Sequence, residues 1–278
     1  MKETIRIMID NLKTYDKSGN DKNKNQLGLG SKIFNKCKNL KKIELPKNIT
    51  TITNNMFNGC ENLEYMIIPE GITTIEEYAF ANCINLKSVM FPSTLSTIGN
   101  FAFYGCKNLS NIVFNNDITT IGKYAFCESG LTQLVIPKGV QINNVGDYAF
   151  ANCKKLEKVC IYSDVFKNLP EGIFKDCSSL IGVTVLTDTE ICISAEAFMN
   201  CTKLCMVDIP KANWIDVKAF YNTGLKETII PAVCTVILDE AFANCVNLKY
   251  VCLHNNIRYI GDKVFESCSE LKEIEVCE

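Results

Sequence analysis

The sequence has few of the residues that enzymes and metal sites most often use. Its 278 residues include a single histidine, His254, and a single tryptophan, Trp214. Catalysis by a serine or cysteine usually needs an imidazole beside the nucleophile, and His254 alone could provide one. No two cysteines have the Cys-x-x-Cys spacing of common zinc sites, and no glycine-rich phosphate loop follows a strand-like segment. We therefore expect no enzyme activity and no catalytic residues, and we expect neither a metal nor another cofactor.

One arrangement could still support catalysis. Cys252 lies two residues before His254, and on an extended strand the two side chains face the same side. The alternatives are a thiol–imidazole pair and two exposed residues that lie together by chance.

Strong charge and long apolar segments are also absent. The net charge is −2 and the pI is about 5.7, so no global basic field attracts nucleic acid or anionic lipid. No apolar run approaches the roughly 18 residues of a membrane span. The segment from Met1 to Asp10 is too charged for a signal peptide. We expect no nucleic-acid partner and no membrane span. The protein is at the cell surface or secreted if a signal precedes this sequence, and otherwise cytoplasmic.

What the sequence does contain is an internal repeat marked by phenylalanine. The eleven marker phenylalanines are 22 to 24 residues apart: Phe34, Phe57, Phe80, Phe103, Phe126, Phe150, Phe174, Phe198, Phe220, Phe242 and Phe265. In most units a cysteine lies three residues after the marker and a leucine three residues later, as in Phe57, Cys60 and Leu63. A unit this short cannot bury its own apolar side, but stacked units bury one another. The pattern therefore predicts a solenoid of eleven coils.

Each unit contains two strand-like segments. After the leucine comes an alternating segment, such as Val89-Met90-Phe91, and proline often ends it. Equivalent segments of successive coils must run parallel, so we expect one parallel sheet along one side. Residues 72–75 predict a second extended piece, and residues 76–82 a short helical turn. The predicted fold class is α/β leaning to β, with residues 1–26 as an N-terminal edge strand and mobile polar loop, and residues 27–278 as the solenoid.

Two units depart from the pattern in the same way. Residues 126–131 and 220–225 lack the cysteine of the motif, gain a glycine and reach the leucine one residue earlier. We expect this glycine to permit a tighter turn through a positive φ. Because the departure occurs twice, it predicts an alternative corner and not decay of the repeat.

Sixteen cysteines would usually indicate disulfides or metal ligands, but nine of them follow the repeat. We expect these nine to form a buried row of free thiols that pack as small apolar side chains: Cys37, Cys60, Cys83, Cys106, Cys153, Cys177, Cys201, Cys245 and Cys268. The other seven leave their exposure and redox state open: Cys127, Cys160, Cys192, Cys205, Cys234, Cys252 and Cys277. So many free thiols favour a reducing or anaerobic setting.

The unit Ala-Phe-x-x-Cys-x-x-Leu-x-x-Ile-x-Ile-Pro resembles the BspA-like leucine-rich repeats, over roughly residues 27–278. The resemblance implies a curved right-handed superhelix with a parallel sheet on its concave face and turns with extended or helical pieces on its convex side. It also implies a microbial surface protein that adheres to host matrix or cell-surface proteins. The asparagine ladder of commoner leucine-rich repeats is absent, so the hydrogen bonds of the turn must be satisfied in another way.

Part of the sheet face is predicted to be apolar. Five successive outward positions form an apolar stripe, and polar or aromatic residues lie beside it: the stripe contains Ile67, Met90, Val113, Val135 and Cys160, and its rim contains Tyr65, Asn111 and Lys158. A one-sided sheet normally exposes polar residues, so the stripe predicts a binding site. Alternatively, β-branched residues occupy strands whatever they face, or curvature of the sheet covers them. Trp214, on the flank, is either a packed edge residue or part of an interface.

These features favour a macromolecule-binding module with a protein ligand on the concave face. The alternative is an intracellular leucine-rich-repeat scaffold or regulatory protein. The last unit stops at the end of its strand, which predicts an uncovered sheet edge. Three explanations remain open: a longer protein, sufficient protection by charges such as Glu273 and Glu275, or end-to-end self-association.

Overall fold

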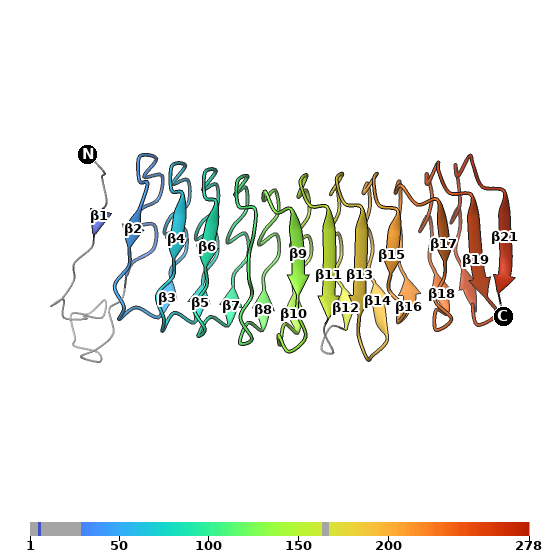
Figure 1. Ribbon diagram of the computed structural model, residues 1–278, viewed down its shortest axis with the longest axis horizontal. Coiled ribbons are helices and arrows are strands. Elements are labelled where there is room, and N and C mark those ends of the chain that lie inside the picture. Colours follow the sequence, from blue (N-terminus) through green and yellow to red (C-terminus); the bar gives the residue numbers. More distant parts are fainter. Residues whose placement is uncertain (1–4, 7–28, 163–166, 278) are drawn as a thin grey trace.

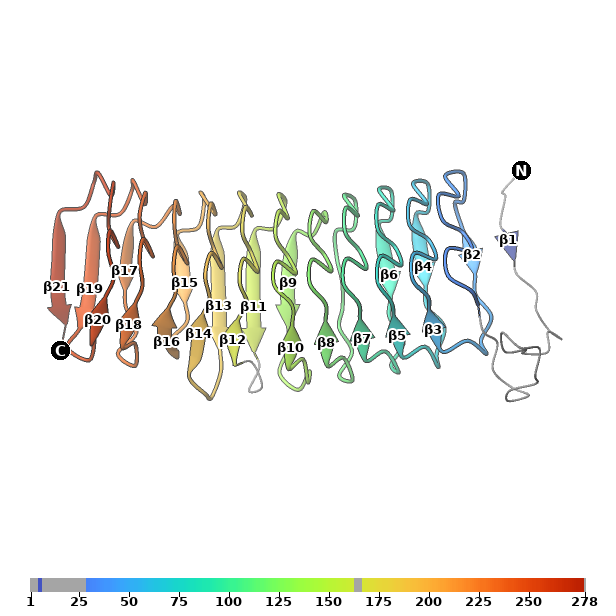
Figure 2. The same ribbon diagram turned by 180° about the vertical axis from the view of Figure 1, so that it is seen from behind.

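The structure is a computed structural model that describes residues 5–6, 29–162 and 167–277. These residues form strands and turns, with no helix among them. Successive coils are stacked along one axis in chain order, as Figure 1 and the reverse view in Figure 2 show. The predicted repeat architecture is confirmed as a parallel-sheet β-solenoid, whereas the helical contribution to an α/β class is not observed.

Strands follow two sides of the solenoid. The first side begins with β1 (Ile5–Arg6) and then carries the segments that follow the motif leucine: β2 (Ile43–Glu44), β4 (Tyr65–Ile67), β6 (Ser88–Met90), β9 (Gln133–Ile136), β11 (Lys158–Tyr162), β13 (Gly182–Leu186), β15 (Met206–Asp208), β17 (Glu227–Ile229), β19 (Tyr250–His254) and β21 (Glu273–Cys277). The second side carries shorter strands: β3 (Thr51–Ile52), β5 (Thr74–Ile75), β7 (Thr97–Ile98), β8 (Thr120–Ile121), β10 (Asn144–Val145), β12 (Asn168–Leu169), β14 (Ile191–Ile193), β16 (Ala212–Ile215), β18 (Val236–Ile237) and β20 (Tyr259–Ile260). Every ladder is parallel, and the equivalent residues pair in register except between β14 and β16, where the register shifts by one residue after Ile191.

The first side is interrupted where one continuous sheet was expected. The ladders of the described residues are β1-β2, β4-β6, β9-β11-β13-β15 and β17-β19-β21. A single bridge extends β4-β6 to the next coil, from Ser88 to Asn111. The second side has two longer ladders, β3-β5-β7-β8-β10 and β12-β14-β16-β18-β20. The first side is therefore the less regular of the two.

The corner that contains the marker phenylalanine has a ladder of its own. The N–H groups of Asn55, Phe57 and Gly59 donate to carbonyl oxygens of the next coil at 3.0, 2.8 and 2.8 Å. The residues two before and two after the marker have positive φ in every coil, for example 55° at Tyr78 and 56° at Asn82. An α-helix needs consecutive right-handed residues, so left-handed residues four apart prevent it. The helical turn predicted at residues 76–82 is therefore wrong.

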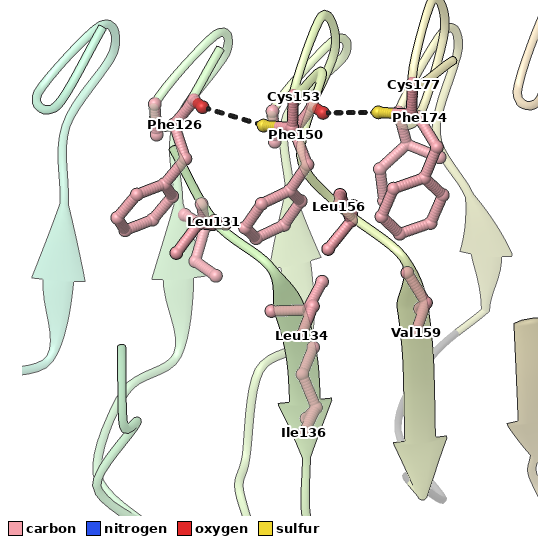
Figure 3. Close-up of a cluster of buried hydrophobic side chains, with 14 of the residues drawn as sticks. Phe126, Leu131, Leu134, Ile136, Phe150, Cys153, Leu156, Val159, Phe174 and Cys177 are labelled. Carbon is pink, nitrogen blue, oxygen red and sulfur yellow. Dashed lines mark hydrogen bonds between the residues drawn. The ribbon is translucent and has the colours of Figure 1, made fainter. Parts of the chain in front are cut away.

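The marker phenylalanines form the central column of the core. Phe103 is fully buried, and its ring stacks on Phe80 at 5.1 Å and on Phe126 at 5.2 Å, with interplanar angles of 4°. Figure 3 shows the same arrangement for the next three coils, with Leu131 and Leu156 beside the rings. The column continues to both ends, where Phe34 and Phe265 are only partly buried.

The cysteines of the motif hold adjacent coils together as hydrogen-bond donors. The thiol of Cys153 donates to the carbonyl oxygen of Phe126 at 3.3 Å, and that of Cys177 to Phe150 at 3.3 Å (Figure 3). The same bond recurs in every motif cysteine from Cys60 onward, as a thiol ladder. The turn that lacks an asparagine ladder is bonded by other groups, for example where the Gly71 N–H donates to the Thr94 hydroxyl, which itself donates to the carbonyl oxygen of Ile72. All nine row cysteines are free as predicted, and all are buried except Cys37 in the first described coil.

The two variant corners place hydroxyl groups in the thiol ladder. Ser129 and Thr223 fill the cysteine position, where both are buried and contact the thiols of Cys153 and Cys245 at 3.2 and 3.1 Å. The predicted positive φ of Gly130 is wrong, because this residue lies outside the left-handed region. Glycine is needed there for space, since a Cβ atom would lie 2.2 Å from the carbonyl oxygen of Lys107. Gly224, the equivalent glycine of the second corner, also has a φ outside the left-handed region.

At the N-terminus, β1 pairs with β2 through Ile5↔Ile43 and Arg6↔Glu44. The rest of the predicted edge strand and the predicted loop at residues 13–26 lie outside the described residues.

Candidate binding surface

The first side of the solenoid presents four of the five stripe residues to solvent. Ile67, Met90, Val113 and Val135 have exposed fractions of 66, 63, 72 and 43%. Ile67, Met90 and Val135 lie on strands that bury the alternate side chains, as in the exposed–buried–exposed pattern of β4 and β6. Val113 lies in a segment outside the strands, where the same alternation of burial is present. Ile67 and Met90 are direct register partners.

Cys160 differs from the expectation for the stripe. It is the register partner of Val135 in the ladder of β9 and β11, yet only 8% of its surface is exposed. Its short side chain lies beside the phenol of Tyr162, whose pKa the thiol raises. Cys160 therefore closes the exposed stripe at this end and adds little apolar surface to it.

The predicted rim residues lie next to the stripe and are exposed. Tyr65 pairs in register with Ser88, which bridges to Asn111, and Lys158 pairs with Gln133. The rim is charged near Tyr65, because the Lys87 ammonium forms an ion pair with Glu64 at 2.9 Å and lies 5.5 Å from the ring of Tyr65. The hydrogen bond from Lys87 lowers the pKa of the Glu64 carboxyl. An apolar centre with a polar border is the arrangement found in many protein interfaces.

A second apolar area on the same face was not predicted from the sequence. Met206 and Ile229 are exposed on β15 and β17, and they border a cavity of about 730 Å³ that also reaches Gly182 of β13. The available signal was the absence of a side chain at Gly182, in the row that holds Ser88 and Lys158.

The structure does not support a thiol–imidazole pair of Cys252 and His254. Cys252 forms a disulfide with Cys277 on the neighbouring strand, with a Cα–Cα separation of 5.8 Å, so its sulfur is not a free nucleophile beside His254. Of the other cysteines off the row, Cys205 is exposed, while Cys127, Cys160 and Cys234 are buried and Cys192 is intermediate. Within the described ranges, no three His, Cys, Asp or Glu side chains are grouped as metal ligands.

Trp214 lies in β16, on the second side, between its register partners Cys192 and Val236. It is partly exposed there, away from the stripe. As to membrane segments, the described part of the chain has no helix with the length and apolar character to cross a bilayer.

Comparison with known proteins identifies the repeat. The family model of the BspA type leucine rich repeat region, in six copies, matches residues 28–157, 141–209 and 167–278. Among solved structures, a leucine-rich repeat protein from Bacteroides ovatus is 24% identical, with a TM-score of 0.68 over 88% of this chain and 75% of that one.

Two further structures are similar over most of this chain. The pneumococcal vaccine antigen PcpA is 21% identical, with a TM-score of 0.51 over 95% of this chain and 71% of that one. A leucine rich cell surface protein from Faecalibacterium prausnitzii is 22% identical, with a TM-score of 0.48 over 90% of this chain and 83% of that one. No curated protein sequence matches the chain. The family match spans residues 28–278, a range that includes the described coils, and the chain belongs to the BspA-type leucine-rich-repeat family.

Proposed function

We propose that this protein binds a protein ligand through the exposed part of the apolar stripe on its first side. The observation that carries the proposal is that Ile67, Met90, Val113 and Val135 expose 43–72% of their surface from equivalent positions of four successive coils. Strands about 4.8 Å apart place such residues in a row of roughly 15–20 Å, which suits the centre of a protein interface. Tyr65, Asn111 and Lys158 supply polar groups at its border.

We further propose that the ligand is a host matrix or cell-surface protein and that this protein acts at the microbial cell surface. This part extends to the chain what the BspA-like resemblance implies about adhesion.

An intracellular scaffold of the same fold is the second candidate. The observation in its favour is that fourteen of the cysteines are free thiols, which persist most easily in a reducing compartment. Fractionation of the producing cells, followed by protease treatment of intact cells, separates the two candidates. Loss of the protein on protease treatment supports surface display, and full protection supports the intracellular scaffold.

The binding proposal is tested with Met90→Lys and Val113→Lys together. Immobilised fibronectin, fibrinogen, laminin and collagen serve as probes, and affinity is measured by surface plasmon resonance. Two buried charges at the centre of an interface are expected to weaken binding by about 100-fold or more. The matched control is Val246→Lys, because Val246 is an exposed apolar residue on a corner away from the sheet face. Unchanged affinity of the double variant for a probe that the parent protein binds would contradict the proposal.

A further inference from the structure

The first side has an opening between β15 and β17. No ladder among the described strands joins these two, although β16, which lies between them in sequence, pairs with β14 and β18 on the second side. Figures 1 and 2 show β17 set further from β15 than from β19. The corner holds the same two coils together, since the Phe198 and Phe220 rings stack at 5.1 Å. Adjacent coils are thus joined on two sides and separate on the third.

The opening coincides with a variant corner. Residues 220–225 lead into β17, and Gly224 lies so close to the preceding coil that a Cβ atom would be 2.5 Å from the carbonyl oxygen of Thr202. The other variant corner leads into β9, which likewise has no ladder to the preceding coil among the described residues. The ladder also ends between β2 and β4, where the corner has the regular motif, but the other two interruptions both follow this corner. At β17 we attribute the opening to the shorter path that the corner gives the chain.

Backbone groups face the opening from both strands. The N–H of Met206 donates toward β13, to Ile181, so the next residue, Val207, directs its N–H and C=O toward β17. The N–H of Ile230 donates toward β19, to Cys252, so the preceding residue, Ile229, directs its N–H and C=O toward β15. Two strand edges with unpaired groups form a template for an added strand.

The side chains around the opening select the kind of strand that would fit. Its cavity of about 730 Å³ is lined on the core side by Val207 and Leu225, which suit the alternate apolar side chains that an added strand would direct inward. Three exposed carboxylates border it, those of Glu157, Asp208 and Glu227, against the single ammonium of Lys158. The excess of negative charge favours a cationic ligand.

We propose that an extended segment of another protein, with alternating apolar and basic residues, binds in this opening as an added strand beside β15 and β17. Lys158 borders both this site and the stripe of the proposed function, but β11, β13 and β15 lie between Val135 and the opening. The proposal for the opening uses none of the four exposed stripe residues, so each proposal can fail while the other stands.

Labelled octapeptides test the proposal in fluorescence anisotropy. The first alternates valine with lysine, the second alternates valine with glutamate, and the third keeps the lysines but replaces valines with proline, which lacks the N–H donor. We expect the first peptide to bind at least about tenfold more tightly than either of the others. No saturable binding of the first peptide up to about 1 mM would overturn the proposal. Equal binding of the proline peptide would also overturn it, because charge alone would then explain the binding.

Two sets of variants localise the site. Gly182→Val fills the cavity. A Cβ atom at this position would lie 3.3 Å from the flexible end of Met206 and 3.8 Å from its Cβ atom, so the fold is expected to persist. We expect this variant to weaken binding of the valine–lysine peptide by about tenfold or more. The control Ser88→Val lies in the same row outside the opening and is expected to leave binding unchanged. Asp208→Lys combined with Glu227→Lys is expected to reverse the preference toward the glutamate peptide. Unchanged binding by both sets would overturn the proposal. Sedimentation velocity gives a further check. If the free protein self-associates and Gly182→Val abolishes this self-association, the proposal is overturned, because a second copy of the chain would then be the occupant.

Discussion

Replacement of Phe103 by alanine tests the central column of the core. Phe103 is fully buried, and both faces of its ring are covered by Phe80 and Phe126 at centroid distances of 5.1 and 5.2 Å. Phe91 contacts it from a third direction, at 5.9 Å. Truncation therefore removes a large side chain from a site whose neighbours are fixed by their own stacks and cannot collapse into the space. We expect the free energy of unfolding to fall by about 3–5 kcal/mol, the range for buried phenylalanines.

Phe265 provides the matched comparison for the Phe103→Ala experiment. Its ring stacks on one described neighbour, Phe242 at 5.8 Å, and it is only partly buried. Truncation of Phe265 exposes less surface and leaves room for relaxation, so we expect a loss of about 1–2 kcal/mol. The order of the two losses follows from the number of covered ring faces.

Urea unfolding followed by far-UV circular dichroism and by the fluorescence of Trp214 measures both variants. Repeat proteins can lose cooperativity when a central unit is weakened, and coincidence of the two signals shows whether one transition describes the whole chain. If Phe103→Ala lowers stability by less than about 1 kcal/mol, or by no more than Phe265→Ala, the assignment of the phenylalanine column as the main core is refuted.

The remaining predictions concern the thiols. Titration with a thiol reagent in denaturant without reductant is expected to count fourteen free thiols out of sixteen, and the native protein is expected to react rapidly only at exposed Cys37 and Cys205; a count below nine would contradict a ladder of free thiols. Burial raises the pKa of the Cys106 thiol from 9.0 to about 12, so the unfolded chain loses this proton at lower pH than the folded chain does. The contribution of this thiol to the free energy of unfolding is therefore complete below about pH 8 and falls as the pH rises from 9 toward 12. Each such thiol contributes up to about 1.4 kcal/mol per pH unit in that window. Urea midpoints at several alkaline pH values are expected to decline less steeply for Cys106→Ala than for the control Cys205→Ala, and equal slopes would argue against the raised pKa.

The sequence was sufficient to predict the coils because each requirement of the stack recurs in every unit. A phenylalanine column, a cysteine row and two strand segments keep one phase across the chain, and the ladders have the register that this phase implies. The corner was misread because its conformation is set by contact with the next coil. Left-handed φ values occur at Tyr78 and Glu196, whose residue types do not favour them. Asparagine and glycine after the marker, as at Asn82 and Gly105, were a usable signal for the second left-handed position.

The candidate surface was predictable only in part, for a related reason. The alternation of a strand fixes which side chains point outward, and Ile67 through Val135 follow it. The exposed area of an outward residue also depends on its neighbours, which is why Cys160 is buried although its position is equivalent. The opening beside β17 depends on how one shorter corner changes the path of a coil relative to the preceding coil. A residue pattern records that the corner is shorter, but not which ladder is lost as a result.

The free thiols give weaker evidence about the compartment than their number suggests. A thiol reacts as its thiolate, and burial raises the pKa of Cys60, Cys106 and Cys268 to between about 11 and 12. These thiols also donate to backbone carbonyl groups, so they are held in the protonated state and covered by the next coil. A buried row of this kind persists in an oxidising environment for as long as the coils stay closed. The distinction between a surface protein and an intracellular scaffold therefore depends on the two exposed thiols, Cys37 and Cys205, and not on the sixteen cysteines of the sequence.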